Sequence, residues 1–336
     1  MISCTEFIPA YSELFKFMDQ RSGRQAVYKY WAKFFDPDSF PLGDHLKRAG
    51  LRGCWDYWSI IFREEACDST MFYHEKEGWF TWCMHRCPSK DRFRKLGYLT
   101  PFDEYCLHCD GYNRILESAG LQRISDDRGQ EAASCRSVII DPKTFQGNAQ
   151  EMIGQMYRCE TQGCCYESNP SGCPLNRPGV MVQHCTSGSL CYLHPQFHIN
   201  MEIHIEDVVQ MYGKDGLLEY LAQYTTAFHK PLIEAVRKDG LAPLRDYLLK
   251  IYEMENASDA LNISMTDRQL HVKTSYSPAI RYMKEVGHVP QENFEATTSI
   301  VYGELARQSG VGFEMISYDT ETGGAEYCFR CHTDAE

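Results

Sequence analysis

The sequence has no long apolar run and no excess of positive charge. No segment of the 336-residue chain approaches the roughly 18 uncharged apolar residues that a membrane helix needs. Residues 1–6 have neither the basic region nor the apolar core of a signal peptide. Lys and Arg number 34 against 46 Asp and Glu, and the net charge of -12 disfavours binding to nucleic acid or anionic lipid. We therefore expect a cytoplasmic protein with neither nucleic acid nor a membrane among its partners.

The motifs of several large enzyme classes are also missing. The sequence has no G-x-S-x-G, P-loop, G-x-G-x-x-G or H-E-x-x-H motif, which argues against the common serine hydrolases, nucleotide-binding enzymes and zincins. Cysteine, by contrast, is abundant, with 16 residues. In a reducing compartment this number predicts metal ligation or thiol chemistry rather than a disulfide framework.

A weak internal repeat relates the two halves of the sequence. Shifted by 190 positions, residues 27–97 align with residues 217–287 without a gap, and twelve aligned pairs are identical. With small insertions or deletions the match extends to Cys135, which then aligns with Cys328. The repeat predicts two copies of one domain.

We therefore predict an α+β fold of two tandem homologous domains, residues 1–148 and 196–336, that form a pseudo-dimer. Between them lies a cysteine-rich connector, residues 149–195, which has no counterpart in the repeat. A structureless connection of this length is uncommon in a compact protein. We expect a bound metal to hold it in place.

Each domain has the same expected order of elements. Apolar residues at i, i+3, i+4 and i+7 predict helices, and short apolar or alternating runs predict strands. The elements expected in both domains are helices over 51–65 and 241–255, strands over 79–86 and 269–276, helices over 102–118 and 292–308, and a final hairpin that is clearest at 312–330.

The first domain contains a group of cysteines at irregular spacing. In a helix, Cys106, Cys109 and Asp110 would share one face. Cys87, at the end of an expected strand, and Cys135, in the expected hairpin, could approach that face. Four thiolates together suit tetrahedral zinc or an iron–sulfur cluster, and the alternative is that these cysteines pack as small apolar residues. The second domain lacks most of them, which favours one chemically specialised domain.

The connector contains a second group of candidate metal ligands, Cys159, Cys164, Cys165 and Cys173. Cys173 is followed by Pro174, and a Cys-Pro pair that closes a cysteine run is typical of iron–sulfur loops. A structural zinc site fits about as well. A flexible cysteine-rich linker is the alternative without a metal.

Several short matches give the chain a family resemblance. The first domain resembles the L-2-aminothiazoline-4-carboxylic acid hydrolase family in three runs: Cys87-Pro88, Leu96-Gly97-Tyr98 and Tyr105-Cys106-x-x-Cys109-Asp110. The second domain is similar to the family at Pro278, Gly287 and Tyr318. The resemblance covers most of both domains but not the connector. A more distant likeness is to small ligand-binding domains of the vinyl-reductase type.

The family resemblance implies a hydrolase that cleaves a C–N bond of a small cyclic amidine or a related carboxylate. This reaction needs an activated water or thiolate, a proton donor and a cation for the carboxylate. The candidate catalytic residues are Cys106, Cys109, His85, His108 and Asp110, and the candidate substrate-binding residues are Arg86, Tyr98 and His288. Cys106 or Cys109 is either the nucleophile or a ligand of a metal that activates water, since both roles require a thiolate.

A different class of function also fits the sequence. The many cysteines and the missing catalytic motifs suit a non-hydrolytic zinc or iron–sulfur protein that senses a small ligand, transfers electrons or delivers a cofactor. A third hypothesis is a pseudo-dimer that binds an apolar ligand with its aromatic residues, which make up 13% of the chain. The sequence leaves these alternatives and the oligomeric state open.

Overall fold

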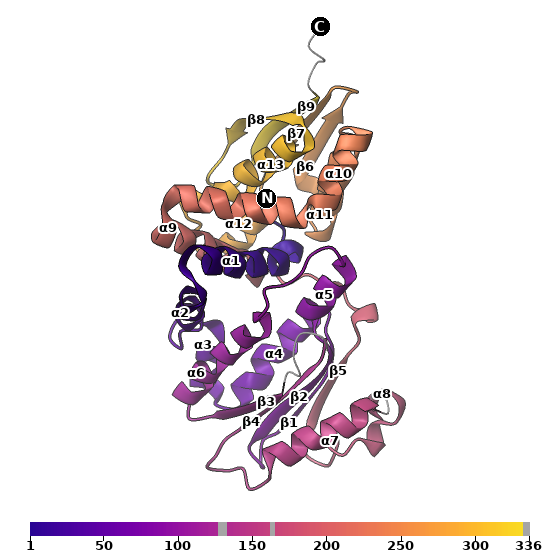
Figure 1. Cartoon of the computed structure of the whole chain (residues 1–336). Helices are drawn as coiled ribbons and strands as arrows, with labels where there is room; N and C mark the ends of the chain where they lie inside the picture. Colours follow the sequence, from indigo (N-terminus) through magenta and orange to yellow (C-terminus); the bar gives the residue numbers. More distant parts are fainter. Residues whose placement is uncertain (127–132, 162–164, 332–336) are drawn as a thin grey trace. The chain divides into compact units, whose positions relative to one another are not determined.

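The structure is a computed structural model that describes residues 1–126, 133–161 and 165–331 (Figure 1). It forms two compact units. The first unit is Met18–Tyr192, and the second unit combines Met1–Phe17 with Leu193–Glu336. Among the described helices, none has both the length and the apolar character of a membrane span. The chain combines helices with two sheets and is a mixed α+β protein, as the sequence predicts.

The first unit contains a five-stranded sheet in the order β3-β4-β2-β1-β5, with every neighbouring pair antiparallel. Its strands are β1 (Asp68–His74), β2 (Trp79–Arg86), β3 (Gln122–Asp126), β4 (Cys135–Ile140) and β5 (Met181–Cys185). Its helices are α2 (Arg24–Phe34), α3 (Pro41–Ala49), α4 (Arg52–Glu64), α5 (Pro88–Leu96), α6 (Gly111–Ser118), α7 (Ala149–Thr161) and α8 (Cys165–Ser168).

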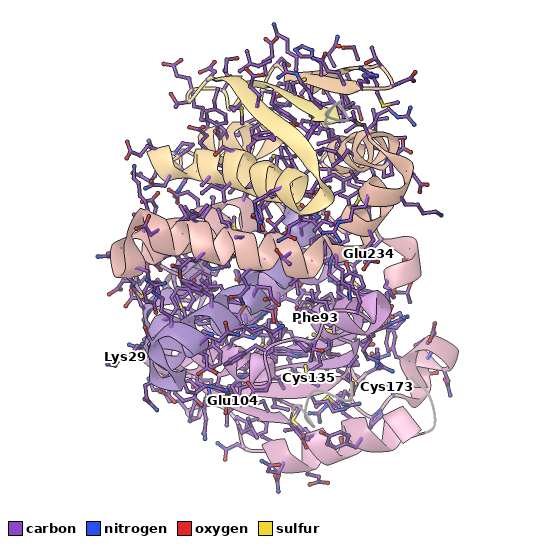
Figure 2. The ribbon with its side chains drawn as sticks, turned by 45° about the horizontal axis from the view of Figure 1, so that its top comes forward. Lys29, Phe93, Glu104, Cys135, Cys173 and Glu234 are labelled. Atoms are coloured by element: carbon purple, nitrogen blue, oxygen red, sulfur yellow. The ribbon has the colours of Figure 1, made fainter. Side chains whose placement is uncertain are left out.

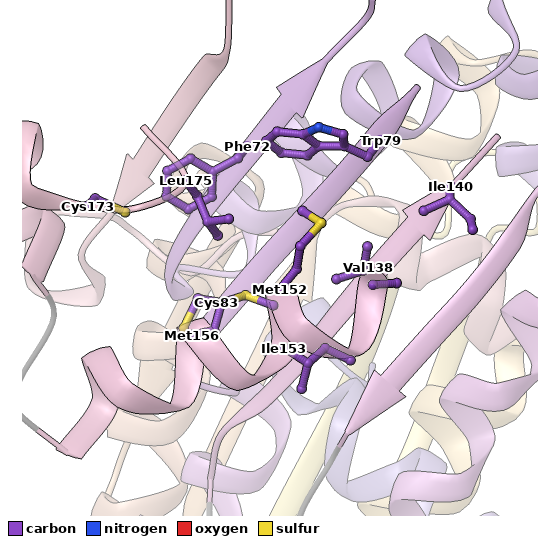
Figure 3. Close-up of a cluster of buried hydrophobic side chains, with 11 residues drawn as sticks. Phe72, Trp79, Cys83, Val138, Ile140, Met152, Ile153, Met156, Cys173 and Leu175 are labelled. Atoms are coloured by element: carbon purple, nitrogen blue, oxygen red, sulfur yellow. The ribbon is translucent and has the colours of Figure 1, made fainter. Parts of the chain in front are cut away.

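Helices cover both faces of this first sheet (Figure 1). On one face Trp58 of α4 packs on Phe80 and Trp82 of β2, with ring centroids 5.7 and 4.9 Å apart. On the other face Cys83 of β2 and Met156 of α7 belong to one buried apolar cluster (Figure 3). Successive residues of a strand point to opposite faces, which places Trp82 and Cys83 in different cores.

The cysteine-rich connector is thus an integral layer of the first unit. It supplies α7 and α8 over the second face and β5 at the edge of the sheet. The observed units divide the chain after Phe17 and after Tyr192, whereas the sequence predicts a division after residue 148.

The second unit contains a four-stranded antiparallel sheet in the order β6-β7-β9-β8. Its strands are β6 (Leu261–Met265), β7 (Gln269–Thr274), β8 (Val311–Tyr318) and β9 (Ala325–Cys331). Its helices are α9 (Gln196–Phe228), α10 (Lys230–Asp239), α11 (Ala242–Met254), α12 (Pro278–Glu285) and α13 (Ala296–Ser309), together with residues up to Phe17 of α1 (Phe7–Ser22).

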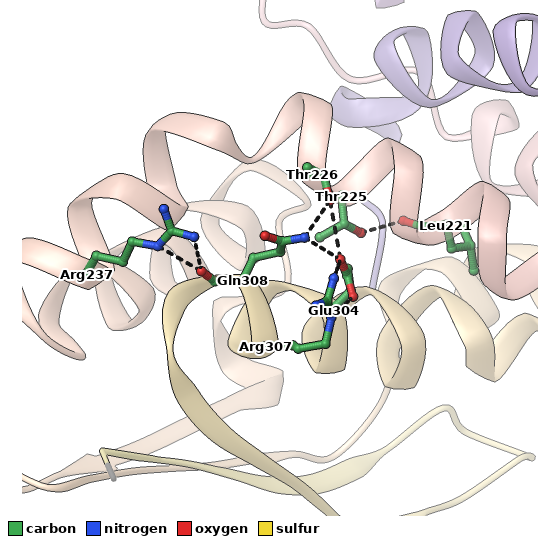
Figure 4. A network of polar contacts seen from close by, with 7 residues as sticks. All are labelled: Leu221, Thr225, Thr226, Arg237, Glu304, Arg307 and Gln308. Carbon is green, nitrogen blue, oxygen red and sulfur yellow. Dashed lines mark hydrogen bonds and ion pairs between the residues drawn. The ribbon is translucent and has the colours of Figure 1, made fainter. Parts of the chain in front are cut away.

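Polar side chains connect three helices of the second unit (Figure 4). The backbone carbonyl of Gln308 accepts hydrogen bonds from Nε and Nη2 of Arg237 at 2.8 and 2.6 Å, which joins α13 to α10. Glu304 accepts one hydrogen bond from Gln308 at 2.8 Å and another from Thr226 of α9 at 3.3 Å. These contacts hold α13 against α9. Helix α13 also packs along β8.

The outer face of the second sheet is charged. His271 and Lys273 of β7 pair with Glu326 of β9 at 2.9 and 3.5 Å, and Arg330 pairs with Glu314 across the hairpin. A charged face needs no cover, whereas the apolar face of the first sheet needs α7.

Both units share an order of elements and a sheet register. The order β1-β2-β4-β3 has the same form as β6-β7-β9-β8. Met84 pairs with Cys135, and Thr274, which lies 190 positions after Met84, pairs with Ala325. The counterpart of Cys135 is therefore Ala325, and the predicted pairing with Cys328 is wrong. The register of the two sheets keeps the offset of 190 positions at these strands.

Backbone conformation follows the same offset of 190 positions. Residues with positive φ occupy equivalent positions in five pairs: Gly23/Gly213, Gly50/Gly240, Ala66/Asn256, Gly97/Gly287 and Gly120/Gly310. Positive φ is uncommon for residues other than glycine, so the coincidence at Ala66 and Asn256 reflects the same turn after α4 and α11.

Candidate functional site

A thiol and an imidazole are in contact just before α6. They lie in the 3₁₀ helix Tyr105–Asp110, where the sequence predicted an α-helix. Cys109 Sγ is 3.5 Å from His108 Nε2, and His108 Nδ1 bonds to the backbone carbonyl of Tyr105. A carbonyl oxygen only accepts, so Nδ1 carries the hydrogen. The unprotonated Nε2 therefore faces the thiol.

The surroundings keep this imidazole uncharged. Burial lowers the pKa of His108 to about 4, so the ring is neutral near pH 7 and Nε2 can accept a hydrogen bond from the thiol. The ring of Tyr105 meets it edge-on, with centroids 4.7 Å apart, and the ring of Phe35 lies parallel at 6.5 Å. Aromatic side chains thus form the wall beside Cys109 and His108.

Arg123 of β3 positions the segment that contains Cys109. Its Nη1 donates to the Cys109 carbonyl and to Asn113 Oδ1, both at 3.1 Å, and its Nε donates to Ser137 Oγ at 2.7 Å. Only 6% of the Arg123 side chain is exposed. Arg123 is not among the site residues that the sequence predicts, and its one signal in the sequence is a cation within a short predicted hairpin.

Two further predicted cysteines lie near Cys109 and stay protonated. Burial raises the pKa of the Cys87 thiol to about 12, with hydrogen bonding from the Lys90 backbone lowering it and the Cys109 thiol raising it. Burial likewise raises the pKa of Cys135, and the neighbouring Cys87 and Cys109 add to the effect. These three residues are brought into one region, as the sequence predicts. Cys135, on β4, is labelled in Figure 2.

The sheet separates His85 from the other candidate catalytic residues. His85 Nδ1 lies 3.6 Å from Cys83 Sγ, on the face that α7 covers. Thr70 Oγ1 lies 3.0 Å from His85 Nε2 and 2.8 Å from His184 Nδ1, so one hydroxyl links two imidazoles. His108 and Cys109 lie on the opposite side of the sheet, with α6 and Arg123.

The remaining first-unit candidates lie near the surface. The Asp110 side chain is 53% exposed, with Oδ1 3.4 Å from Arg123. Arg86 donates from Nε to Asp68 at 2.6 Å. Tyr98 is 39% exposed, and Cys106 is partly buried one turn before Cys109. The third predicted substrate-binding residue, His288, belongs to the second unit, where its Nε2 lies 3.0 Å from Glu202 Oε2.

The connector cysteines are described only in part. Cys164, and the side chains of Cys159 and Cys165, lie outside the described residues. Cys173 is 7% exposed and packs in the apolar cluster beneath α7 (Figures 2 and 3). It therefore occupies a different face of the sheet from Cys109.

One group of side chains in the described chain could hold a metal ion. Cys4, His198 and Glu255 of the second unit are buried, and their ligand atoms lie within 4.8 Å of one another. None of the three is among the metal ligands that the sequence predicts. No local motif signals a group whose members are separated by up to 251 positions.

A surface cavity of about 410 Å³ lies where α7 begins. Among the described residues that line it are Lys76, Asn148, Glu151 and Arg177. None of the predicted site residues is part of this lining. The cavity and the thiol chemistry of the first unit are thus at different places.

No protein-family model, curated protein or solved structure matches this chain. The function is therefore inferred from the residues themselves.

Proposed function

We propose that the first unit is a cysteine-dependent hydrolase that cleaves a C–N bond of a small cyclic amidine or a related carboxylate. Cys109 is the nucleophile and His108 is the general base. The observation that carries this proposal is the 3.5 Å contact between Cys109 Sγ and the unprotonated Nε2 of His108. A cysteine is activated when an adjacent imidazole accepts the proton of its thiol.

Two proton transfers complete the proposed reaction. His108 takes the thiol proton, and the Cys109 thiolate attacks the amidine carbon. His108 then returns the proton to the departing nitrogen as the C–N bond breaks, which leaves a thioimidate on Cys109. Water attacks that carbon, and the thiol is released. Arg123, bonded to the Cys109 carbonyl at 3.1 Å, fixes the position of the nucleophile.

We also propose that the two units arose by internal duplication and that only the first kept this chemistry. The common register and the five pairs of positive φ support the duplication. At the positions equivalent to His108, Cys109 and Arg123 the second unit has Thr298, Ser299 and Phe313. The pseudo-dimer stays a prediction.

The proposed setting is the cytoplasm, and the proposed partner is a small-molecule substrate. Of the thirteen cysteines that the structure describes, none is joined in a disulfide. A reducing compartment keeps cysteines in this state.

A zinc or iron–sulfur site in the first unit is the second candidate. Beside the effect of burial, Cys87 and Cys135 raise the pKa of Cys67, and Cys87 raises the pKa of Cys135, so these thiols lie near one another. A metal would displace protons that these buried thiols otherwise keep. In this alternative Cys109 is a ligand rather than a nucleophile.

Hydrolysis by the full-length protein tests the two candidates against each other. L-2-aminothiazoline-4-carboxylate and related cyclic amidines are offered in the presence of a chelator, and the ring-opened product is measured. We expect Cys109→Ser to abolish turnover and His108→Gln to lower kcat by about 100-fold. Cys191→Ser, at an exposed cysteine, is the control and keeps wild-type activity. Activity that survives in Cys109→Ser, or that the chelator removes, contradicts the thiolate mechanism.

A further inference from the structure

Three buried ionisable side chains meet in the second unit. Cys4 lies in the 3₁₀ helix Cys4–Glu6, His198 in α9, and Glu255 directly after α11. Their exposed fractions are 1%, 2% and 8%. Three elements that are distant in the sequence therefore each direct one metal-ligating side chain to a single place.

The two carboxylate oxygens of Glu255 have different partners. Glu255 Oε1 accepts from Ser3 Oγ at 2.6 Å and from the Cys4 backbone N–H at 2.7 Å. Glu255 Oε2 lies 3.1 Å from His198 Nε2. Outer hydrogen bonds of this kind are typical of ligands that are oriented toward a metal.

The carboxylate of Glu255 is buried together with the imidazole of His198. Glu255 Oε2 and His198 Nε2 lie 3.1 Å apart, and their side chains are 3% and 2% exposed. Burying a carboxylate costs free energy unless it is paired or binds a metal.

We propose that Cys4 Sγ, His198 Nε2 and Glu255 Oε2 bind a single zinc ion. Zinc accepts sulfur, imidazole nitrogen and carboxylate oxygen together, whereas calcium and magnesium prefer oxygen alone. The 3.1 Å between Nε2 and Oε2 suits two adjacent ligands of one ion, which then replaces the hydrogen between them.

This zinc joins the segment around Cys4 to α9 and to the end of α11, and its three protein ligands are buried. Three protein ligands leave one position of a tetrahedral zinc open. The site is separate from Cys109 and His108 of the first unit and goes beyond the proposed hydrolase.

Metal content measures the site directly. Full-length protein is purified with zinc and passed through a column that contains a weak chelator, and bound zinc is counted per chain. We expect Cys4→Ser and His198→Gln each to retain one zinc fewer than the wild type. Cys328→Ser removes an equally buried thiol of the second unit outside the group and keeps the wild-type count. Because the variants are compared with one another, zinc held by other cysteines cancels.

Equal zinc in the wild type and in Cys4→Ser overturns the proposal, and so does an equal loss in Cys328→Ser, which would indicate general destabilisation. A second measurement needs only the wild type and therefore does not depend on whether a variant folds. Wild-type crystals are grown with zinc, and anomalous scattering is recorded at the zinc edge. A peak between the three side chains supports the site, and its absence overturns it. Cys109→Ser is expected to lose hydrolysis but keep this zinc, so the two proposals fail separately.

Discussion

At the scale of single residues, one backbone hydrogen bond decides the chemistry of Cys109. The Tyr105 carbonyl fixes the hydrogen of His108 on Nδ1 and leaves Nε2 to face the thiol. A side chain in the other tautomer would present an N–H to the sulfur and could not accept its proton. The local turn, rather than the residue types alone, therefore makes the pair competent as a nucleophile and base.

The pH dependence of hydrolysis follows from this residue. Burial lowers the pKa of His108 to about 4, while Glu65 and Asp110 raise it and Arg123 lowers it. His108 accepts a proton only in its neutral form, so we expect kcat/KM to rise as the pH increases through about 4 and to level off before neutrality. A pH profile of the wild-type enzyme measures this. A midpoint at about 6.5, the ordinary value of histidine, contradicts a buried base.

At the scale of elements, α9 depends on a single glycine. Gly213 interrupts the helix with φ 73° and ψ −178°. This region of backbone space is almost closed to residues with a Cβ atom. Gly23 has φ 77° at the equivalent position after α1, so both units contain the same break between two helices.

Gly213→Ala is expected to destabilise the second unit by about 1–3 kcal/mol, because alanine is strained in this conformation. Urea unfolding followed by circular dichroism measures the change in free energy. Gly303→Ala in α13 is the matched control: a Cβ atom there makes only ordinary contact with Phe313 at 3.6 Å. Alanine favours a helix over glycine, so this control is expected to gain about 0.5–1 kcal/mol. An equal loss of stability in both variants contradicts the role of positive φ.

At the scale of the whole molecule, two cores exist in one chain. The first unit has its own apolar cluster under α7, and the second unit is built around α9, α13 and a separate sheet. All five tryptophans, between Trp31 and Trp82, lie in the first unit. Tryptophan fluorescence therefore reports the first unit alone, whereas circular dichroism reports both.

Ile153→Ala tests this division. Ile153 of α7 is 4% exposed in the apolar cluster, and removing its side chain is expected to cost the first unit about 2–5 kcal/mol. The fluorescence transition should move to a lower urea concentration, and the shift should correspond to this loss of free energy. The part of the circular dichroism change that belongs to the second unit should stay in place. One shared transition that shifts as a whole contradicts two independent cores.

The sequence by itself determined the local elements and their repetition. Amphipathic spacing predicted the helices that became α4 and α11, and apolar runs predicted β2 and β7. The strands β1 and β6 were not predicted, nor were the helices α5 and α12. Pro88 and Pro278 begin these two helices, and proline is favoured in the first turn of a helix.

Only the tertiary structure decided which chemical groups meet. His85 and Cys109 were assigned to one candidate site, but the alternation of β2 sends His85 to the face beneath α7. Cys4, His198 and Glu255 share no motif and meet only because Met1–Phe17 packs within the second unit. Periodicity is a property of neighbouring residues and can therefore be recognised in the sequence. The pairing of distant surfaces depends on how whole faces fit, and no short stretch of sequence records it.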